Sequence, residues 1–193
     1  MVNNIANYTK HDIARVFLNL EDKKGRKDLS KKLEIGEGTL RTILDILKKK
    51  KLIESRQQGH QFSKKGEKLC RNILKIIDVP KATSTSFYPG KKQVGVLLKN
   101  KKDIKVGIEK RDAAIRLGAD GAIILKYNQK LYLPEFDYKS DDFKKLEEQF
   151  VLKNNNILII TFSDTLRFAE ISAIACAAEI NKDLKELIEN IIN

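Results

Sequence analysis

The sequence is poor in the residues that build disulfide, metal and redox sites. Its 193 residues include two cysteines, two histidines, one methionine and no tryptophan. Two isolated cysteines, Cys70 and Cys176, make neither a disulfide framework nor a metal-binding cluster. We therefore expect two buried thiols in a cytoplasmic protein, with no bound metal and no cofactor.

Long apolar runs and catalytic motifs are missing as well. A membrane-spanning helix needs roughly 18 apolar residues, and the best candidate, residues 168–180, contains Glu170 and Glu179. The N-terminal stretch MVNNIANYTKHD lacks the apolar core of a signal peptide. Residues 82–193 contain no histidine, and the chain has no glycine-rich phosphate loop and no Ser-His-Asp arrangement. These absences predict a protein that is not an enzyme and does not bind a membrane.

Positive charge is plentiful and unevenly distributed. The chain has 38 Lys and Arg against 26 Asp and Glu, a net charge of +12. Residues 1–81 hold 20 basic and 10 acidic side chains, a net +10, whereas residues 82–193 hold 18 and 16, a net +2. This asymmetry indicates that the N-terminal part faces a polyanion and that the rest has another task.

A change in composition marks a domain boundary. The segment DVPKATSTSFYPGKK (78–92) carries two of the three prolines, a Ser/Thr cluster and a Pro-Gly pair, which interrupt regular structure. We therefore predict an N-terminal domain over residues 1–80, a linker over 81–92 and a second domain over 93–193.

The N-terminal part has the order of elements of a winged helix-turn-helix. Ile13, Val16, Phe17 and Leu20 form one apolar stripe at helical spacing. A short helix that Asp28 could cap, a turn containing two glycines and a third amphipathic helix follow. The stretch RQQGHQF reads as a hairpin, and residues 63–78 as a closing helix with Ser63 as a possible cap.

The third helix is the expected reading element. In a helix-turn-helix this helix enters the major groove, and its N-terminal residues reach the base edges. Thr39, Arg41 and Thr42 occupy these positions. An arginine such as Arg41 can make a bidentate hydrogen bond to guanine. Ser30 and Lys32, on the preceding helix, stand where backbone contacts are expected.

Four consecutive lysines, Lys48 to Lys51, end the same helix. They come too late for base reading, and cations are favourable at a helix C-terminus in any case. For each of these lysines, including Lys48, two interpretations are equally good: the side chain is a solvated helix end, or it contacts a phosphate. The hairpin is a better candidate, because Arg56, Gln57 and His60 lie at its tip, where a wing touches the minor groove or phosphates. We expect Lys64 to flank the same phosphate track.

From residue 93 onward strands and helices alternate. Their order, β-α-β-β-α-β-α, predicts a ferredoxin-like split βαβ domain with extra C-terminal helices, so the whole chain is of the α+β class. Two stretches could bind a small anionic effector, one with Lys110, Arg111 and Asp112 and one with Asp164, Thr165 and Arg167. Arg111 and Arg167 could clamp a carboxylate or phosphate. The structural alternative makes Asp164 a helix cap and Arg167 a surface ion pair.

The last twelve residues form an amphipathic pattern. Leu184, Leu187, Ile188, Ile191 and Ile192 recur at helical spacing. This tail either closes the core or forms a dimer seam.

The stretch GIEKRDAAIRLGADGAIILKY, the AEISAIACAAEI helix and the leading winged helix together resemble an archaeal group of predicted transcription regulators. Those proteins pair an N-terminal winged helix with a C-terminal domain of unassigned function. The resemblance implies a DNA-binding regulator and carries over no ligand and no catalytic residue.

These observations favour a transcription regulator that binds double-stranded DNA as a homodimer, with a second domain that senses a ligand or dimerises. Two alternatives remain open at this stage. The second domain could be an enzyme or an anion-binding module, with the winged helix used for partner binding. The winged helix could also bind protein in place of DNA, although the net charge of +10 over residues 1–81 argues against this.

Overall fold

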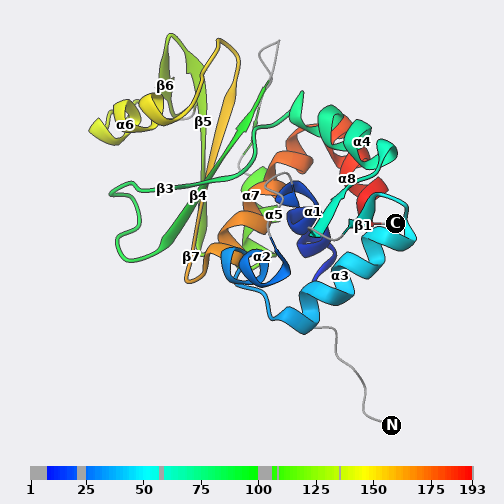
Figure 1. Ribbon diagram of the computed structural model, residues 1–193. Coiled ribbons are helices and arrows are strands. Elements are labelled where there is room, and N and C mark those ends of the chain that lie inside the picture. Colours follow the sequence, from blue (N-terminus) through cyan, green and yellow to red (C-terminus); the bar gives the residue numbers. More distant parts are fainter. Residues whose placement is uncertain are drawn as a thin grey trace. The chain divides into compact units, whose positions relative to one another are not determined.

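The computed structural model describes residues 8–20, 25–56, 59–99, 106–107, 109–134 and 136–192. The chain forms two compact units (Figure 1). The first comprises residues 1–73 together with 186–193, and the second comprises residues 74–185. The fold is α+β, with helices and a hairpin in the first unit and an antiparallel sheet with helices in the second.

Three helices begin the first unit: α1 (Lys10–Leu18), α2 (Arg26–Lys32) and α3 (Glu37–Lys49). A capping box starts α1, because the amide of Asp12 donates to the hydroxyl of Thr9 and the Asp12 carboxylate accepts from the Thr9 amide. The expected cap at Asp28 is wrong. Gly25 is the N-cap of α2, and Asp28 lies in its first turn.

A two-stranded hairpin and a further helix follow, namely β1 (Ile53–Arg56), β2 (Gly59–Phe62) and α4 (Lys64–Leu74). Ser63 caps α4 as expected, since its hydroxyl accepts from the amide of Gly66. The hairpin is anchored on the core by Phe62, whose ring meets that of Phe17 edge-on at a centroid distance of 4.9 Å. Helices followed by a hairpin give this unit a shape consistent with a winged helix.

Gly66 allows α4 to begin directly against the chain that enters the hairpin. A Cβ atom at this position would lie 1.9 Å from the carbonyl oxygen of Leu52, closer than any packing allows. The amide of Ser63 donates to that same carbonyl at 3.0 Å. The close approach between α4 and Leu52 therefore requires glycine, which has no Cβ atom, at position 66.

The second unit is built on an antiparallel sheet with the order β3-β4-β7-β5-β6. The strands are β3 (Lys81–Thr83), β4 (Lys92–Leu98), β5 (Gly121–Asn128), β6 (Lys130–Tyr132) and β7 (Ile157–Ser163). β7 is buried along its whole length, which is why it lies at the centre. Three helices accompany the sheet: α5 (Glu109–Ile115), α6 (Asp141–Gln149) and α7 (Leu166–Ile180).

Helices cover both faces of this sheet (Figure 1). Leu158, Ile160 and Phe162 of β7 point to the face that packs on α6, where Phe143 and Leu146 complete the core. The opposite face carries Thr161, whose hydroxyl donates to the carbonyl of Ala169 in α7 at 2.6 Å. Gly95 gives Phe150 its space, because a Cβ there would lie 2.5 Å from the Phe150 ring.

The ferredoxin-like arrangement is not what the structure shows. β7, the last strand of the chain, separates β4 from β5, and β3 adds a fifth strand at the edge. The order of elements along the chain does not determine the order of strands in the sheet. That order depends on which strand is buried on both faces.

The chain also divides differently from the expectation. Residues 81–92 were expected to be a linker but belong to the second unit: β3 pairs with β4, and the Thr85 amide donates to the side-chain oxygen of Gln93 at 2.8 Å. The tail forms α8 (Lys182–Ile192), which from Glu186 onward belongs to the first unit. Leu184, Ile188 and Ile191 are buried, so the tail helps to close a core.

Within the described residues, no helix is long and apolar enough to cross a membrane.

Candidate functional site

Helix α3 presents one apolar and one polar face. Leu40, Ile43, Leu44 and Leu47 are all buried, and each contributes about 1.5–3 kcal/mol by leaving water. Arg41 and Thr42 lie on the exposed side, and Thr39 is half-buried. Within the described part of the chain, no hydrogen bond or ion pair engages the Arg41 guanidinium. The core-facing stripe thus fixes the helix and leaves Arg41 directed to solvent near its N-terminal end.

A buried arginine holds the turn that precedes α3. Arg15 is 1% exposed, and its guanidinium donates to the carbonyl of Leu33 at the end of α2. The Ser30 hydroxyl donates to the carbonyl of Ile35 in the same turn. Ser30 therefore has a structural task, while Lys32 is exposed. Sequence reasoning missed Arg15, although an arginine one residue away from the apolar stripe was a signal for it.

The hairpin carries its candidate residues away from the core. Arg56 is exposed at the end of β1 and pairs in register with Gly59, whose φ of 122° favours glycine. His60 is half-buried, and its Nδ1 lies 3.3 Å from the hydroxyl of Ser55. Gln57, predicted at the tip, lies outside the described residues.

Positive charges from two helices, α2 and α3, act on His60 of the hairpin. Burial lowers the pKa of His60, and so do Lys48 of α3 and Arg26 of α2, while Asp45 opposes them. Lys48 is held by Asp45 at 3.5 Å. His60 is therefore neutral at pH 7, and the positive charge here comes from Arg26 and Lys48. An anion such as a phosphate is the partner that this field favours.

The end of the lysine run faces carboxylates. Lys50 of that run and Lys65 of α4 line a hollow of about 600 Å³ together with Glu186, Glu189 and Asn190 of α8. The ammonium of Lys65 donates to the Lys50 carbonyl at 3.3 Å. Lys64, by contrast, is exposed and has no partner among the described residues. Lys50 and Lys65 thus lie beside a hollow that two carboxylates of α8 also line.

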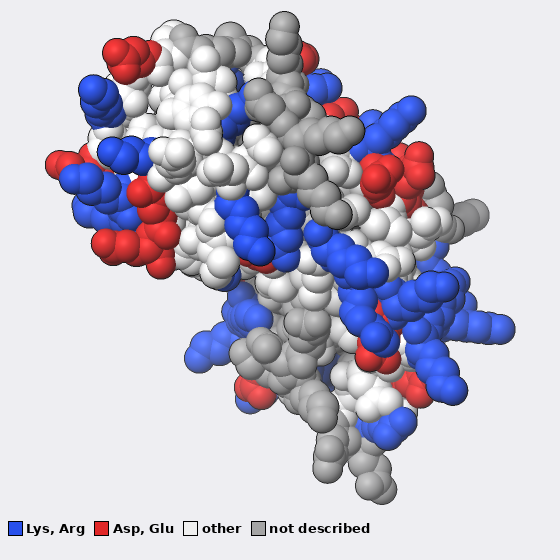
Figure 2. All heavy atoms as spheres, turned by 90° about the horizontal axis from the view of Figure 1, so that it is seen from above, with Lys and Arg blue, Asp and Glu red and all other residues white. Residues whose placement is uncertain are grey.

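Basic side chains crowd one part of the surface in Figure 2, whereas elsewhere blue and red side chains are mixed. Arg41, Arg56 and Lys64 are exposed residues of the first unit that carry charge without a described partner. This set defines the candidate interface of the first unit.

In the second unit the two predicted anion-binding stretches lie at opposite ends of α7. The thiol of Cys176, near the end of α7, donates to the carbonyl of Lys110 at 3.3 Å, whereas Gly118 lies against the Phe168 ring near its start. Helices α5 and α7 therefore run antiparallel, and Arg111 is separated from Arg167 by about 14 Å along the axis. The expected clamp by these two arginines does not form.

The stretch before α7 has other partners. Asp164 binds Lys91 at 2.8 Å, and Lys91 also binds Asp120 at 2.9 Å. These hydrogen bonds raise the pKa of Lys91. Thr165, not Asp164, is the N-cap of α7, because its hydroxyl accepts from the Phe168 amide at 3.2 Å. The Arg167 guanidinium lies 5.6 Å from the centre of the Phe168 ring.

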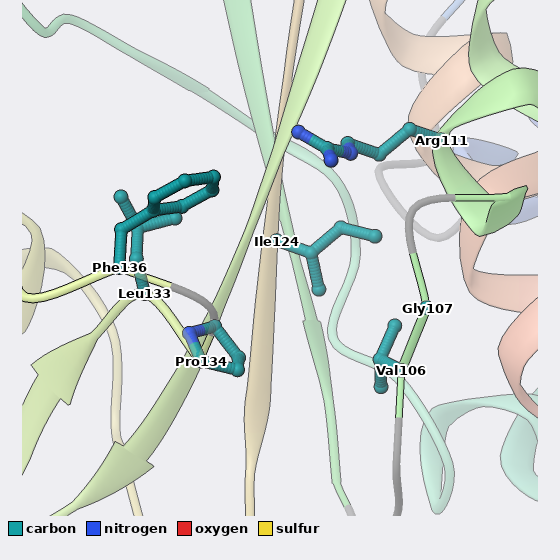
Figure 3. Close-up of a pocket in the computed structure, with 7 residues that line it drawn as sticks. All are labelled: Val106, Gly107, Arg111, Ile124, Leu133, Pro134 and Phe136. Atoms are coloured by element: carbon teal, nitrogen blue, oxygen red, sulfur yellow. The ribbon is translucent and has the colours of Figure 1, made fainter.

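Asp112 is exposed on α5, and Lys110 is half-buried beside α7. Arg111 points toward a small hollow of about 30 Å³ (Figure 3). The hollow is lined by Val106, Gly107, Arg111, Ile124, Leu133, Pro134 and Phe136. The described residues contain no group of three His, Cys, Asp or Glu side chains that could hold a metal ion.

Comparisons with known proteins agree with the division into two parts. Residues 9–68 match the family model described as the PH0730-like N-terminal domain, and residues 89–180 match a domain of unknown function, DUF4443. A solved structure, the hypothetical protein PH0730 from Pyrococcus horikoshii OT3, is similar at 30% identity and a TM-score of 0.78. The match covers 95% of this chain and 99% of that one. No curated protein matches the chain. The chain belongs to the PH0730-like family, with a PH0730-like N-terminal domain followed by a DUF4443 domain.

Proposed function

We propose that the protein is a DNA-binding transcription regulator whose first unit acts as a winged helix-turn-helix. Helix α3 lies in the major groove in this proposal, and the hairpin contacts the backbone or the minor groove. The observation that carries it is the exposure of Arg41 on α3 and Arg56 on the hairpin, both without a described partner, in the part of the chain that holds nearly all of the net charge.

Each residue has a separate role. Arg41 stands on the second turn of α3 with its guanidinium in solvent, the geometry in which an arginine makes two hydrogen bonds to guanine. Thr42 donates its hydroxyl to the Gly38 carbonyl at 3.2 Å, which leaves its methyl group and oxygen lone pair for a base edge or phosphate. Arg56 and Lys64 neutralise phosphates, which adds affinity without sequence preference.

The second unit serves as the effector-binding or dimerisation domain of this regulator. Among its described residues, surface lysines such as Lys91 and Lys99 are paired with carboxylates. A homodimer would place two α3 helices on half-sites about one DNA turn, or a multiple of it, apart. This domain plan is the one that a ligand-responsive regulator needs, and it accounts for the near-neutral charge of residues 82–193.

Selection of binding sites from a pool of random duplexes, followed by footprinting, tests the proposal. The wild-type protein should enrich a defined sequence. Arg41→Ala should relax the preference at one base pair and weaken binding to the selected site by about 1–3 kcal/mol. Lys49→Ala, an exposed change late in the same helix, is the matched control and should weaken all duplexes alike and slightly. An unenriched pool, or equal effects of the two variants, would contradict the proposal.

A further inference from the structure

The hollow beside Arg111 lies on the face of the sheet that α5 and α7 cover. Ile124 of β5 pairs with Ile159 of β7, which points to the same face as Thr161, the residue bound to α7. Ile124 is 7% exposed and forms the floor. The lining also includes Leu133, Pro134 and Phe136, which follow β6 in the chain.

Two side chains of opposite character face each other across this floor. Figure 3 shows the Arg111 guanidinium on one side of Ile124 and the Phe136 ring on the other. The Phe136 side chain is 61% exposed, and no ring contact to it is present in the described residues. An exposed aromatic ring beside a hollow and a cation is a recurrent feature of ligand sites, because burying it on a partner is favourable.

We propose that this hollow binds a small organic carboxylate with a flat apolar body, such as an aromatic acid. The carboxylate would meet the Arg111 guanidinium, which can donate two parallel hydrogen bonds. The apolar body would lie on Ile124 and be covered by Phe136. The 30 Å³ of enclosed space suits the carboxylate end of such a ligand, and the body occupies the open side under the Phe136 ring.

The charged residues around the hollow predict how substitutions change the affinity for an anionic ligand. Lys110 is the neighbour of Arg111, and both are basic, whereas the Glu109 carboxylate lies against Gly107 at the wall of the hollow. Glu109 therefore repels an anionic ligand, and its neutralisation should tighten binding. This proposal rests on the effector role proposed for the second unit. Ligand binding is measured without DNA, so a failure of ligand binding can be told apart from a failure of DNA binding.

The test is a calorimetric or NMR titration of the full chain with benzoate. For a ligand of this size we expect saturable binding with a dissociation constant of about 0.1–1 mM. Benzyl alcohol, which lacks the charge, and acetate, which lacks the ring, should each bind at least about fivefold more weakly. Competition by inorganic phosphate at equal concentration would show a general anion site and would overturn the specificity for an organic acid.

Substitutions around the hollow test whether the ligand binds there. Arg111→Gln should weaken benzoate binding about tenfold or more, and Phe136→Ala several-fold, while Glu109→Gln should strengthen it. Arg116→Gln, an exposed arginine just beyond the end of the same helix, is the matched control and should leave binding unchanged. Unchanged thermal midpoints show that each variant is folded. Absence of saturable binding up to 10 mM, or equal binding by wild type and Arg111→Gln, would overturn the proposal.

Discussion

The two units handle their charged side chains differently. In the second unit several surface cations are paired: Lys91 bridges Asp120 and Asp164, and Lys99 binds Asp78 at 2.7 Å. In the first unit Arg41, Arg56 and Lys64 are exposed without a described partner. A paired lysine contributes to the shape of its own unit, whereas an unpaired one creates a field that acts on other molecules. Net charge alone therefore says less than the pairing of each charge.

The largest expected effect concerns the entry to the hairpin in the first unit. Gly66→Ala would place a methyl group against the Leu52 carbonyl, and a backbone atom cannot rotate away. We expect the free energy of unfolding of the first unit to fall by about 3 kcal/mol. Thermal unfolding with hydrogen exchange of the α1–α4 amides measures this.

Gly38→Ala is its matched control, because the open space around Gly38 accepts a methyl group. Alanine is the better helix former, so this variant should gain about 0.5–1 kcal/mol. Similar effects at the two glycines would show that the tight approach at Gly66 is not needed.

A smaller loss is expected at the turn before α3. Arg15→Met removes the charged donor to the Leu33 carbonyl, and a hydrogen bond of this kind contributes about 1.5–3 kcal/mol. Lys31→Met, an exposed change on α2, should have almost no effect on the chemical denaturation midpoint. This pair compares a buried basic residue that supports the first unit with an exposed one; equal midpoints would remove the distinction.

In the second unit the corresponding test concerns an acidic residue, Asp142. Asp142 accepts hydrogen bonds from the hydroxyl and the amide of Ser86, both at 2.6 Å. These bonds hold the pKa of Asp142 below its ordinary value of 3.8. Because the folded pKa is the lower one, the stabilisation is complete above pH 3.8 and disappears as the pH falls through the folded value.

Asp142→Asn should therefore lower stability at pH 7 by about 1–3 kcal/mol and flatten the loss of stability below pH 4. Denaturation midpoints between pH 2 and 7 measure both effects. Asp141→Asn, the exposed neighbour, should leave the midpoints nearly unchanged; a pH profile of Asp142→Asn identical to that of the wild type would contradict the assignment.

The smallest expected effect is on thiol reactivity, and it compares the units directly. Cys70 lies in the first unit and Cys176 in the second, and both are buried. Burial raises the pKa of Cys176 to about 12, so little thiolate forms at pH 8. Both thiols should resist iodoacetamide in the native protein. Gly66→Ala should speed the labelling of Cys70 alone, as mass spectrometry of the two peptides can show; equal acceleration would mean that the units open together.

Local periodicity predicted most of the elements. The stripe on α3 and the Ser63 cap follow from spacing of a few residues, so the sequence was enough for them. The strand order was not predictable from element order, because β7 takes the centre through pairing with strands far away in the chain.

The candidate sites divide in the same way. The exposed positions of Arg41 and Arg56 agree with expectation, since helix phase and hairpin order determine them. The separation of Arg111 from Arg167 depends on the antiparallel packing of α5 and α7, which no local pattern shows. The Lys50 and Lys65 hollow depends on α8, whose return to the first unit was equally hidden.

The central claim is that unpaired cations of the first unit bind DNA. Fluorescence anisotropy of a labelled duplex, titrated with protein over a salt series, tests it most directly. The wild type should show a steep fall of log affinity with log salt, and Arg56→Ala/Lys64→Ala should reduce that slope by about 1.8, roughly 0.9 for each lost phosphate contact. Lys92→Ala/Lys144→Ala, which removes two exposed cations of the second unit, should leave the slope unchanged. Equal slopes for all three proteins, or no binding at low salt, would contradict the claim.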